Sequence, residues 1–146
     1  MPDQETLERA QEDAREGKSP STQAGEFVRE EIHHVRERKH GAKSAKQVIA
    51  IGLSKARRAG VKLGTPKGSP STRTKAAQDT RAAKKRSGKK SATRSRATIK
   101  ALKRESRNAA SHQAVSRQSK SAAARRGKQN RKKAAMKAAQ TRKRAA

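Results

Sequence analysis

Large apolar side chains are concentrated in one short part of the chain. Ten of the fourteen Leu, Ile, Val and Phe residues lie between positions 27 and 63. Within this part they recur at steps of one, three and four residues, which is the spacing of one face of a helix. Two such faces in succession predict a helical hairpin. The predicted hairpin core consists of Phe27, Val28, Ile32 and Val35 in the first helix and Val48, Ile49 and Leu53 in the second.

Capping residues indicate where the two helices begin and end. Ser19 followed by Pro20 is a typical N-cap with proline in the first turn. Ser44 with Gln47 three residues later is typical of a capping box. We expect the first helix to end at Gly41, after a basic last turn. The hairpin is near the roughly 40-residue lower limit for independent folding, so we expect a dimer or docking on a partner to complete it.

Charge divides the chain on either side of this hairpin. Residues 1–40 hold ten acids and seven Lys/Arg, a net charge of −3. Residues 41–146 hold two acids and 33 Lys/Arg, a net of +31, and the two values sum to +28. We therefore predict three regions. They are an acidic head with a polar, solvated helix at 1–18, the helical hairpin at 19–63, and a basic low-complexity tail at 64–146.

The tail has the composition of a disordered segment. Leu, Ile, Val and Phe make up under a tenth of the whole chain, and the net charge is high. Ala, Lys and Arg are good helix formers, but repulsion between like charges opposes helices in the free protein. The predicted fold class is mostly α with a large disordered fraction. The tail segments that we expect to become helical when phosphates neutralise them are 71–86, 96–125 and 128–145.

A short repeat links the head to the tail. The sequence GKSPST at 17–22 resembles KGSPST at 67–72. Because Ser-Pro is a good N-cap and first-turn pair, we interpret the repeat as a reused helix start. A phosphorylation site is the alternative.

Several function classes are excluded or disfavoured by what the sequence lacks. There is no cysteine, so a disulfide framework, a thiolate metal site and a cysteine nucleophile are excluded. The acids offer no pair that is expected to be buried, and burial is what tunes a catalytic pair. No apolar run has the length of a signal peptide or membrane span. We expect a cytoplasmic protein that is not an enzyme and has no cofactor and no small-molecule substrate.

Histidines and glutamates share one face of the first hairpin helix. Glu30, His33, His34 and Glu37 are three or four residues apart, and His40 is the one residue nearby that can add a ligand from another element. A metal site needs ligands that converge, usually from two elements. We interpret these residues as a solvated helix face with Glu–His pairs, and we predict no metal site.

The basic tail favours nucleic acid as the partner. Its 27 Lys and Arg side chains can neutralise phosphates, and each contact releases counterions. It has no Phe, Tyr or Trp for base stacking and no spaced set of zinc ligands, so we expect contacts to phosphates and not to bases. An anionic membrane is disfavoured because the tail lacks apolar anchors. The predicted phosphate-binding residues are Lys55, Arg57, Arg58, Lys62, Lys84, Lys85, Arg86, Lys89, Lys90, Arg94, Arg96, Lys103, Arg104, Arg125, Arg126, Arg131, Lys132 and Lys133.

Two resemblances add to this interpretation. Residues 17–63, with GEFVREEI, KHG and KQVIAIGLSKARRAGV, resemble a family of small basic bacterial proteins whose shared domain has no established function. That resemblance implies a bacterial source and a small helical domain, but no activity and no catalytic residues. The tail resembles the Lys/Ala-rich tails of linker-histone-like bacterial nucleoid proteins.

The leading hypothesis is therefore a nucleoid-associated, histone-like protein that compacts or protects duplex DNA without sequence specificity. The hairpin would serve for self-association or partner binding. One alternative is an interaction module on RNA or a ribosome-like assembly. Another is a small plasmid-maintenance or stress regulator that reads a site through Lys55, Arg57 and Arg58. A further hypothesis is that the acidic head folds back on the tail and competes with DNA.

Overall fold

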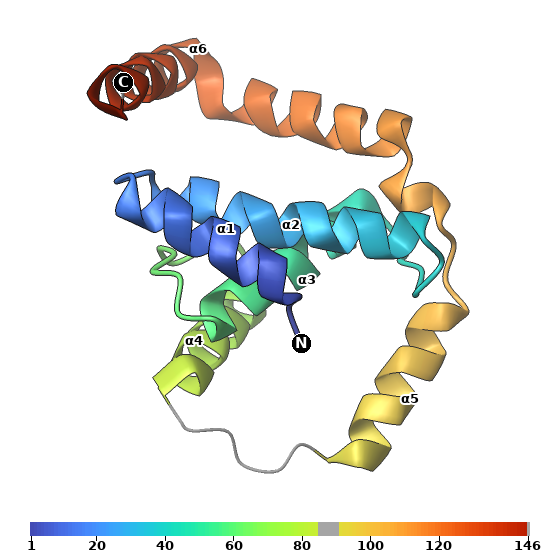
Figure 1. The fold of residues 1–146 in the computed structure, drawn as a ribbon. Coiled ribbons are helices and arrows are strands. Elements are labelled where there is room, and N and C mark those ends of the chain that lie inside the picture. Colours follow the sequence, from blue (N-terminus) through green and yellow to red (C-terminus); the bar gives the residue numbers. More distant parts are fainter. Residues whose placement is uncertain (85–90, 146) are drawn as a thin grey trace.

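The computed structural model describes residues 1–84 and 91–145, and these residues form helices with no β-strand among them (Figure 1). The prediction of a mostly α protein is confirmed. The elements are α1 (Gln4–Arg15), α2 (Pro20–Arg36), α3 (Ala45–Arg58), α4 (Pro70–Lys84), α5 (Ala92–Lys103), the short 3-10 helix η1 (Asn108–Ala110) and α6 (His112–Ala145).

Helices α2 and α3 pack closely against each other as a hairpin. Of the predicted core residues, Phe27, Val35 and Val48 are almost completely buried. The other four, which are partly buried, are Val28, Ile32, Ile49 and Leu53. The two backbones come closest at Gly52, where a Cβ atom would lie only 2.7 Å from the Cα atom of Val28. A side chain of any size at position 52 therefore separates the helices.

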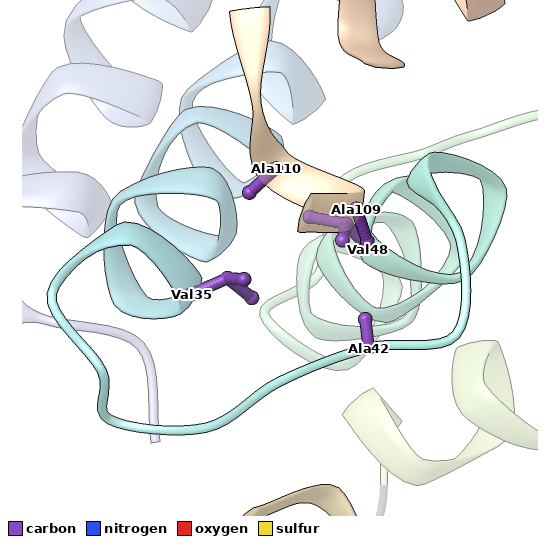
Figure 2. Packing of buried hydrophobic residues seen from close by; sticks show 5 residues of the cluster. All are labelled: Val35, Ala42, Val48, Ala109 and Ala110. Atoms are coloured by element: carbon purple, nitrogen blue, oxygen red, sulfur yellow. The ribbon is translucent and has the colours of Figure 1, made fainter. Parts of the chain in front are cut away.

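The chain itself covers both ends of the hairpin. At one end, α1 packs on α2 and adds Ala10 and Leu7 to the cluster around Phe27. At the other end, Ala109 and Ala110 of η1 lie against Val35 and Val48 (Figure 2). We expected a second copy or a partner to complete the hairpin, but α1 and η1 already cover these two clusters.

The predicted starts of α2 and α3 are confirmed. Ser19 Oγ accepts a hydrogen bond from the Thr22 amide, with Pro20 in the first turn. Ser44 Oγ accepts from the Gln47 amide at 3.3 Å, while Gln47 Oε1 accepts from the backbone N–H of Lys43. The second half of the capping box is thus displaced by one residue.

The predicted end of the first hairpin helix at Gly41 is wrong. Helix α2 ends at Arg36, and Arg38 takes up the left-handed conformation with φ 65°. The reason is tertiary, because the segment that follows is held from outside the hairpin. The Gly41 amide donates to Leu102 O at 2.9 Å, and the Ala42 amide donates to Ser106 O at 3.0 Å.

Gly41 is needed for this close approach and not for a helix stop. A Cβ atom at position 41 would overlap the carbonyl oxygen of Glu105. The absence of a side chain therefore lets the 102–110 segment lie directly on the backbone that follows α2. In this way two parts of the chain about sixty residues apart become one packed unit.

The prediction of a large disordered fraction is wrong for the residues that the structure describes. In the tail they form α4, α5, η1 and α6. Local propensity explains part of this, because Ala, Lys and Arg favour helix and Ser69 and Ser91 cap α4 and α5. Tertiary contacts explain the rest, since α4 buries Ala76 and Asp79 and η1 buries its two alanines.

The interpretation of the short repeat as a reused helix start is confirmed. Ser69 Oγ accepts from the Thr72 amide at 3.3 Å, as Ser19 Oγ accepts from the Thr22 amide at 3.4 Å. In both copies the same hydroxyl also lies 2.8 Å from the serine hydroxyl two residues later. The two segments are therefore the same capping structure used at α2 and α4.

Candidate functional site

Helices α5 and α6 form the most strongly basic part of the described structure. Together they contain sixteen Lys and Arg side chains and no Asp or Glu. The predicted phosphate-binding residues that lie exposed on these helices, or on the residue that caps α5, are Arg94, Arg96, Lys103, Arg104, Arg125, Arg126, Arg131, Lys132 and Lys133. No acidic side chain within either helix neutralises them, so both helices present a field that attracts polyanions.

Gly127 divides α6 into two helical halves. Its backbone has φ 72° and ψ 160°, a conformation that is accessible to glycine and strained for other residues. The second half therefore runs in a different direction from the first (Figure 1). A basic helix with such a bend can follow a curved polyanion better than a straight one.

The cations of the second half of α6 are not spread evenly around the helix. Successive residues are about 100° apart, so the positions of the eight cations in 128–145 can be placed around the axis. Five fall within an arc of about 120°, and we call them the five-cation face: Lys128, Arg131, Lys132, Arg142 and Lys143. The other three lie on the opposite side: Lys133, Lys137 and Arg144.

Three predicted phosphate-binding residues have partners inside the protein instead. Lys55 Nζ lies 2.6 Å from Glu30 Oε1, which belongs to α2. Arg57 is buried and donates to the carbonyl of Gly64, and Arg58 Nε donates to an oxygen of Asp79. Lys55 links α3 to α2, and Arg58 links α3 to α4. Lys55 is partly buried and Arg57 is buried, so these two do not add to the basic surface, whereas the Arg58 side chain is 54% exposed.

The remaining predicted phosphate-binding residues lie outside these helices. Lys62 and Lys84 are exposed, the first after α3 and the second at the end of α4. Lys85, Arg86, Lys89 and Lys90 lie outside the described residues. The structure therefore gathers most of the described candidates on α5 and α6, and the hairpin contributes fewer than the sequence indicated.

Asp79 anchors α4 to α3 through a buried carboxylate. Its oxygens accept hydrogen bonds from Ser54 Oγ at 2.6 Å, Arg58 Nε at 2.8 Å and Lys75 Nζ at 3.0 Å. Burial raises the pKa of Asp79, but the bonds from Ser54, Lys75 and Arg58 outweigh that effect and leave the pKa below its ordinary value. Lys75 belongs to α4 itself, but the bonds from Ser54 and Arg58 of α3 stabilise the charged carboxylate only while α4 is docked.

This arrangement predicts that α4 detaches in acid. A carboxyl with a lowered pKa stabilises the folded state above its unfolded pKa of about 3.9, and that contribution is lost as the pH falls through the lower, folded value. We expect the NMR signal of the buried Ala76 methyl group to move toward its undocked position over that acid range. In Asp79→Asn the same signal should already be shifted at neutral pH, with Val35 and Val48 unchanged. An unshifted Ala76 signal in the variant would contradict this role.

The interpretation of Glu30, His33, His34 and Glu37 as a solvated face is wrong for Glu30 and for the largely buried His34, whereas His33 and Glu37 are exposed. Glu30 is 5% exposed and Glu31 only 1%. Glu31 comes four residues after Phe27 and four before Val35, so it lies in the middle of the buried face. That spacing is the sequence signal that could have identified it.

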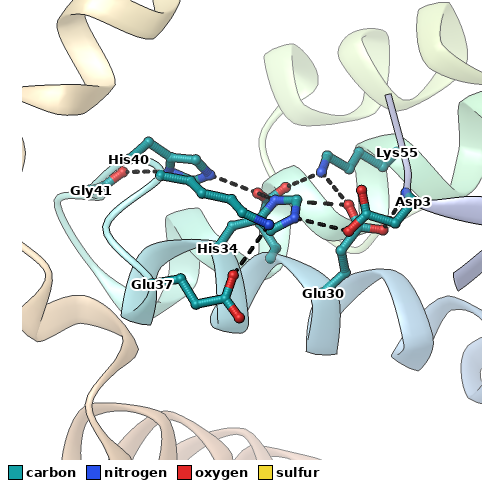
Figure 3. A network of polar contacts seen from close by, with 9 residues as sticks. Asp3, Glu30, His34, Glu37, His40, Gly41 and Lys55 are labelled. Carbon is teal, nitrogen blue, oxygen red and sulfur yellow. Dashed lines mark hydrogen bonds and ion pairs between the residues drawn. The ribbon is translucent and has the colours of Figure 1, made fainter. Parts of the chain in front are cut away.

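The buried glutamates, Lys55 and residues from two other elements form one polar cluster (Figure 3). His40, in the turn after α2, lies with Nε2 2.8 Å from Glu31 Oε1. His34 Nδ1 lies 3.5 Å from the same oxygen, and its Nε2 lies 3.2 Å from Asp3 Oδ2. The fold thus adds three groups to the glutamates and His34 of α2. They are Lys55 from α3, His40 from the turn after α2, and Asp3 from the segment before α1.

Lys55 and the carboxylates stabilise each other's charged forms. Burial raises the pKa of Glu30, but hydrogen bonds from Lys55 and from the Asp3 amide outweigh it, so the pKa is lowered. Burial lowers the pKa of Lys55, yet its bonds to Glu30 and Glu31 raise it overall. The hydrogen bond with His34 lowers the pKa of Asp3. Asp3, Glu30 and Lys55 are therefore each stabilised in their charged forms.

An open cleft of about 460 Å³ between α1 and α2 adjoins this cluster. Its lining includes Asp3, Glu30 and His34 from the cluster, with Arg9 and Lys39 on its rim. The cluster is thus buried against α3 on one side but accessible to small solutes from the other.

Comparison with known proteins gives no relative for this chain. No protein-family model, no curated protein and no solved structure matches it. Among the described helices, none is both long enough and apolar enough to cross a membrane.

Proposed function

We propose that this protein binds nucleic acid, in the first place duplex DNA, by neutralising phosphates with α5 and α6. The observation that carries the proposal is that these two helices hold sixteen cations and no acid. The chain's remaining acids after position 40 support it, because Asp79 is buried among cations and Glu105 is partly buried 3.9 Å from Lys43. Neither acid offsets the charge of the two helices.

The dimensions of α6 suit a duplex backbone. Its 34 residues correspond to a helical path of about 51 Å at about 1.5 Å per residue. Duplex DNA carries one negative charge per roughly 1.7 Å, so phosphates are available along that whole length. The five-cation face can engage one backbone, and the bend at Gly127 lets the first half of α6 approach another part of the duplex.

This mode of binding is expected to be independent of sequence. Base readout requires hydrogen-bonding side chains in a groove, and single-strand binding commonly uses aromatic rings for stacking. The chain has a single Phe and no Tyr or Trp, and Phe27 is buried in the hairpin. Lys and Arg contacts to phosphates position a protein without specifying a sequence.

The biological role that fits this chemistry is compaction or protection of DNA by a nucleoid-associated bacterial protein in the cytoplasm. Binding to RNA or a ribosome-like assembly is the second candidate, because phosphate contacts do not themselves select DNA. A regulator that reads a site through Lys55, Arg57 and Arg58 is less consistent with their contacts to Glu30, Gly64 and Asp79. We also propose that the small basic bacterial proteins that residues 17–63 resemble share the α2–α3 hairpin fold.

A salt titration tests the proposal. The logarithm of the binding constant should fall linearly with the logarithm of the salt concentration, with a slope of about −0.9 per phosphate contact. The triple variant Lys128→Gln, Arg131→Gln, Lys132→Gln should bind duplex DNA more weakly, with a slope reduced in magnitude by about 2.7. Fluorescence anisotropy with two unrelated duplexes measures both quantities.

The matched control removes three exposed cations from other parts of the chain: Arg15→Gln, Arg38→Gln, Lys46→Gln. It has the same net charge as the test variant, so a general loss of charge affects both equally. An equal change of slope in the two variants, or no salt dependence in the wild type, would overturn the proposal. Competition with duplex RNA separates the two candidate partners, since a strong RNA preference supports the second.

A further inference from the structure

His40 has a hydrogen-bond acceptor on each of its ring nitrogens. Nδ1 lies 3.0 Å from the carbonyl oxygen of Gly41, and Nε2 lies 2.8 Å from Glu31 Oε1. A neutral imidazole carries one N–H and one lone pair. If Nδ1–H donates to the Gly41 carbonyl, the lone pair of Nε2 faces a carboxylate oxygen, which is repulsive. A neutral His40 therefore leaves this position short of one positive charge.

His34 is in the same situation. Its Nε2 lies 3.2 Å from Asp3 Oδ2, and its Nδ1 lies 3.5 Å from Glu31 Oε1. Both neighbours are carboxylate oxygens, which accept hydrogen bonds when ionised. With Nε2–H donated to Asp3, the lone pair of Nδ1 points toward the same Glu31 oxygen as the lone pair of His40.

The summed charge of the cluster also indicates that positive charge is missing beside the two imidazoles. Asp3, Glu30 and Glu31 contribute three negative charges and Lys55 one positive charge. The nearby Lys39 and Glu37 pair with each other at 3.2 Å and cancel. With neutral imidazoles the cluster keeps a net charge of −2, close to side chains that are almost completely buried. One divalent cation, or two additional protons, removes that charge.

We propose that Glu31, His34 and His40 bind a divalent transition-metal ion, with Zn²⁺ as the best match. One ligand atom from each of these residues lies within 4.8 Å of the other two. A tetrahedral ion with bonds of about 2.0–2.2 Å separates its ligand atoms by about 3.3–3.6 Å. The 3.5 Å distance from His34 Nδ1 to Glu31 Oε1 already fits, and the 2.8 Å distance from His40 Nε2 to the same oxygen has to lengthen by about 0.5 Å. Two imidazoles disfavour Ca²⁺ and Mg²⁺, which prefer oxygen ligands. Of the three ligands, His34 lines the adjoining cleft, and this is the side from which the ion and a water as fourth ligand would enter.

The surrounding groups are those that support histidine ligands. Metal-binding histidines usually donate their second N–H to a backbone carbonyl or a carboxylate. Here the Gly41 carbonyl is placed for His40 and the Asp3 carboxylate for His34. Lys55 Nζ lies 3.1 Å from the second oxygen of Glu31, Oε2, and orients that carboxylate. A metal is favoured over two protons because two charged imidazole rings with centroids 6.2 Å apart repel each other.

The test is Zn²⁺ binding to the full chain without nucleic acid, measured in competition with a chromophoric chelator. The wild type should bind one Zn²⁺ per chain and gain thermal stability on binding. His34→Gln and His40→Gln should each bind at least about tenfold more weakly, because each lacks one of the three ligands. The matched controls are His33→Gln and His112→Gln, whose side chains are exposed and lie outside this ligand set. Both should bind as the wild type does.

Co²⁺ provides a readout that does not depend on the variants folding. The wild type with Co²⁺ should give the visible absorption bands of a four-coordinate site. Absence of these bands, or Zn²⁺ affinity unchanged in His34→Gln and His40→Gln, would overturn the proposal. A second outcome would also overturn it: the protein binds no Zn²⁺, and its melting temperature rises as the pH is lowered from about 8 to about 6. In that case two imidazolium ions, and not a metal ion, would supply the missing charge. DNA binding is absent from every measurement, so these outcomes are independent of the proposed function.

Discussion

Gly52→Ala should lower the free energy of unfolding by about 2–3 kcal/mol, because an added Cβ forces α2 and α3 apart. The atom that it meets is backbone, the Cα of Val28 at 2.7 Å, so no side-chain rotation can relieve the overlap. Separation of the helices would also loosen the packing of Phe27 and Val48, which lie on the two sides of the interface. The effect is therefore larger than that of an ordinary helix substitution.

The control is Gly25→Ala in the neighbouring helix. A Cβ at position 25 meets no other atom within 4 Å, and alanine favours helix over glycine by about 0.5–1 kcal/mol. The same chemical change should therefore stabilise the protein at position 25 and destabilise it at position 52. Chemical denaturation monitored by circular dichroism measures both. Stabilisation by both substitutions would show that α2 and α3 are not in close contact at Gly52.

Lys55→Ala should cost about 3–5 kcal/mol, since it leaves Glu30 and Glu31 buried without their cation. The Lys55 ammonium lies 2.6 Å from one carboxylate and 3.1 Å from the other. Removing it also eliminates the bond that, together with the bond from the Asp3 amide, outweighs the burial of Glu30 and lowers its pKa. Two acids that were ionised in the fold then have to be protonated or exposed to water.

Lys46→Ala is the matched control for this prediction. Lys46 is exposed on the same helix, so its loss should change the stability by no more than about 0.5 kcal/mol. In the Lys55→Ala background, Glu30→Gln should recover part of the lost stability because it removes one of the unpaired charges. Equal effects of Lys46→Ala and Lys55→Ala would indicate that the cluster is open to solvent.

Local sequence rules located the helix starts well. The hydroxyl of Ser19 or Ser44 and the amide three residues later belong to one turn, so their bond depends on few distant contacts. The hairpin itself was predictable for a related reason. Apolar side chains at helical spacing, such as Phe27 and Val35, have to face a common core wherever the helix lies.

The features that the sequence did not reveal depend on residues far apart. Helix α2 ends before Gly41 because the 102–106 backbone binds the segment that follows it. Lys55 and Arg58 belong to a basic run, which indicated phosphate binding, but Glu30 and Asp79 come close to them only in the fold. Composition indicated a disordered tail because it contains no information on individual tertiary contacts. One such contact is the packing of Ala110 against Val35 and Val48.

The apolar surface formed by Val35, Ala42 and Val48 also constrains the order in which this protein can fold during synthesis. The ribosome synthesises the hairpin first. It adds Ala109 and Ala110, which cover this apolar surface, about fifty residues later. During that interval the nascent chain carries an uncovered apolar patch next to a lengthening cationic segment. The patch can be covered only after Ala110 has been synthesised. A product truncated before Ala110 would therefore keep this apolar patch exposed to solvent.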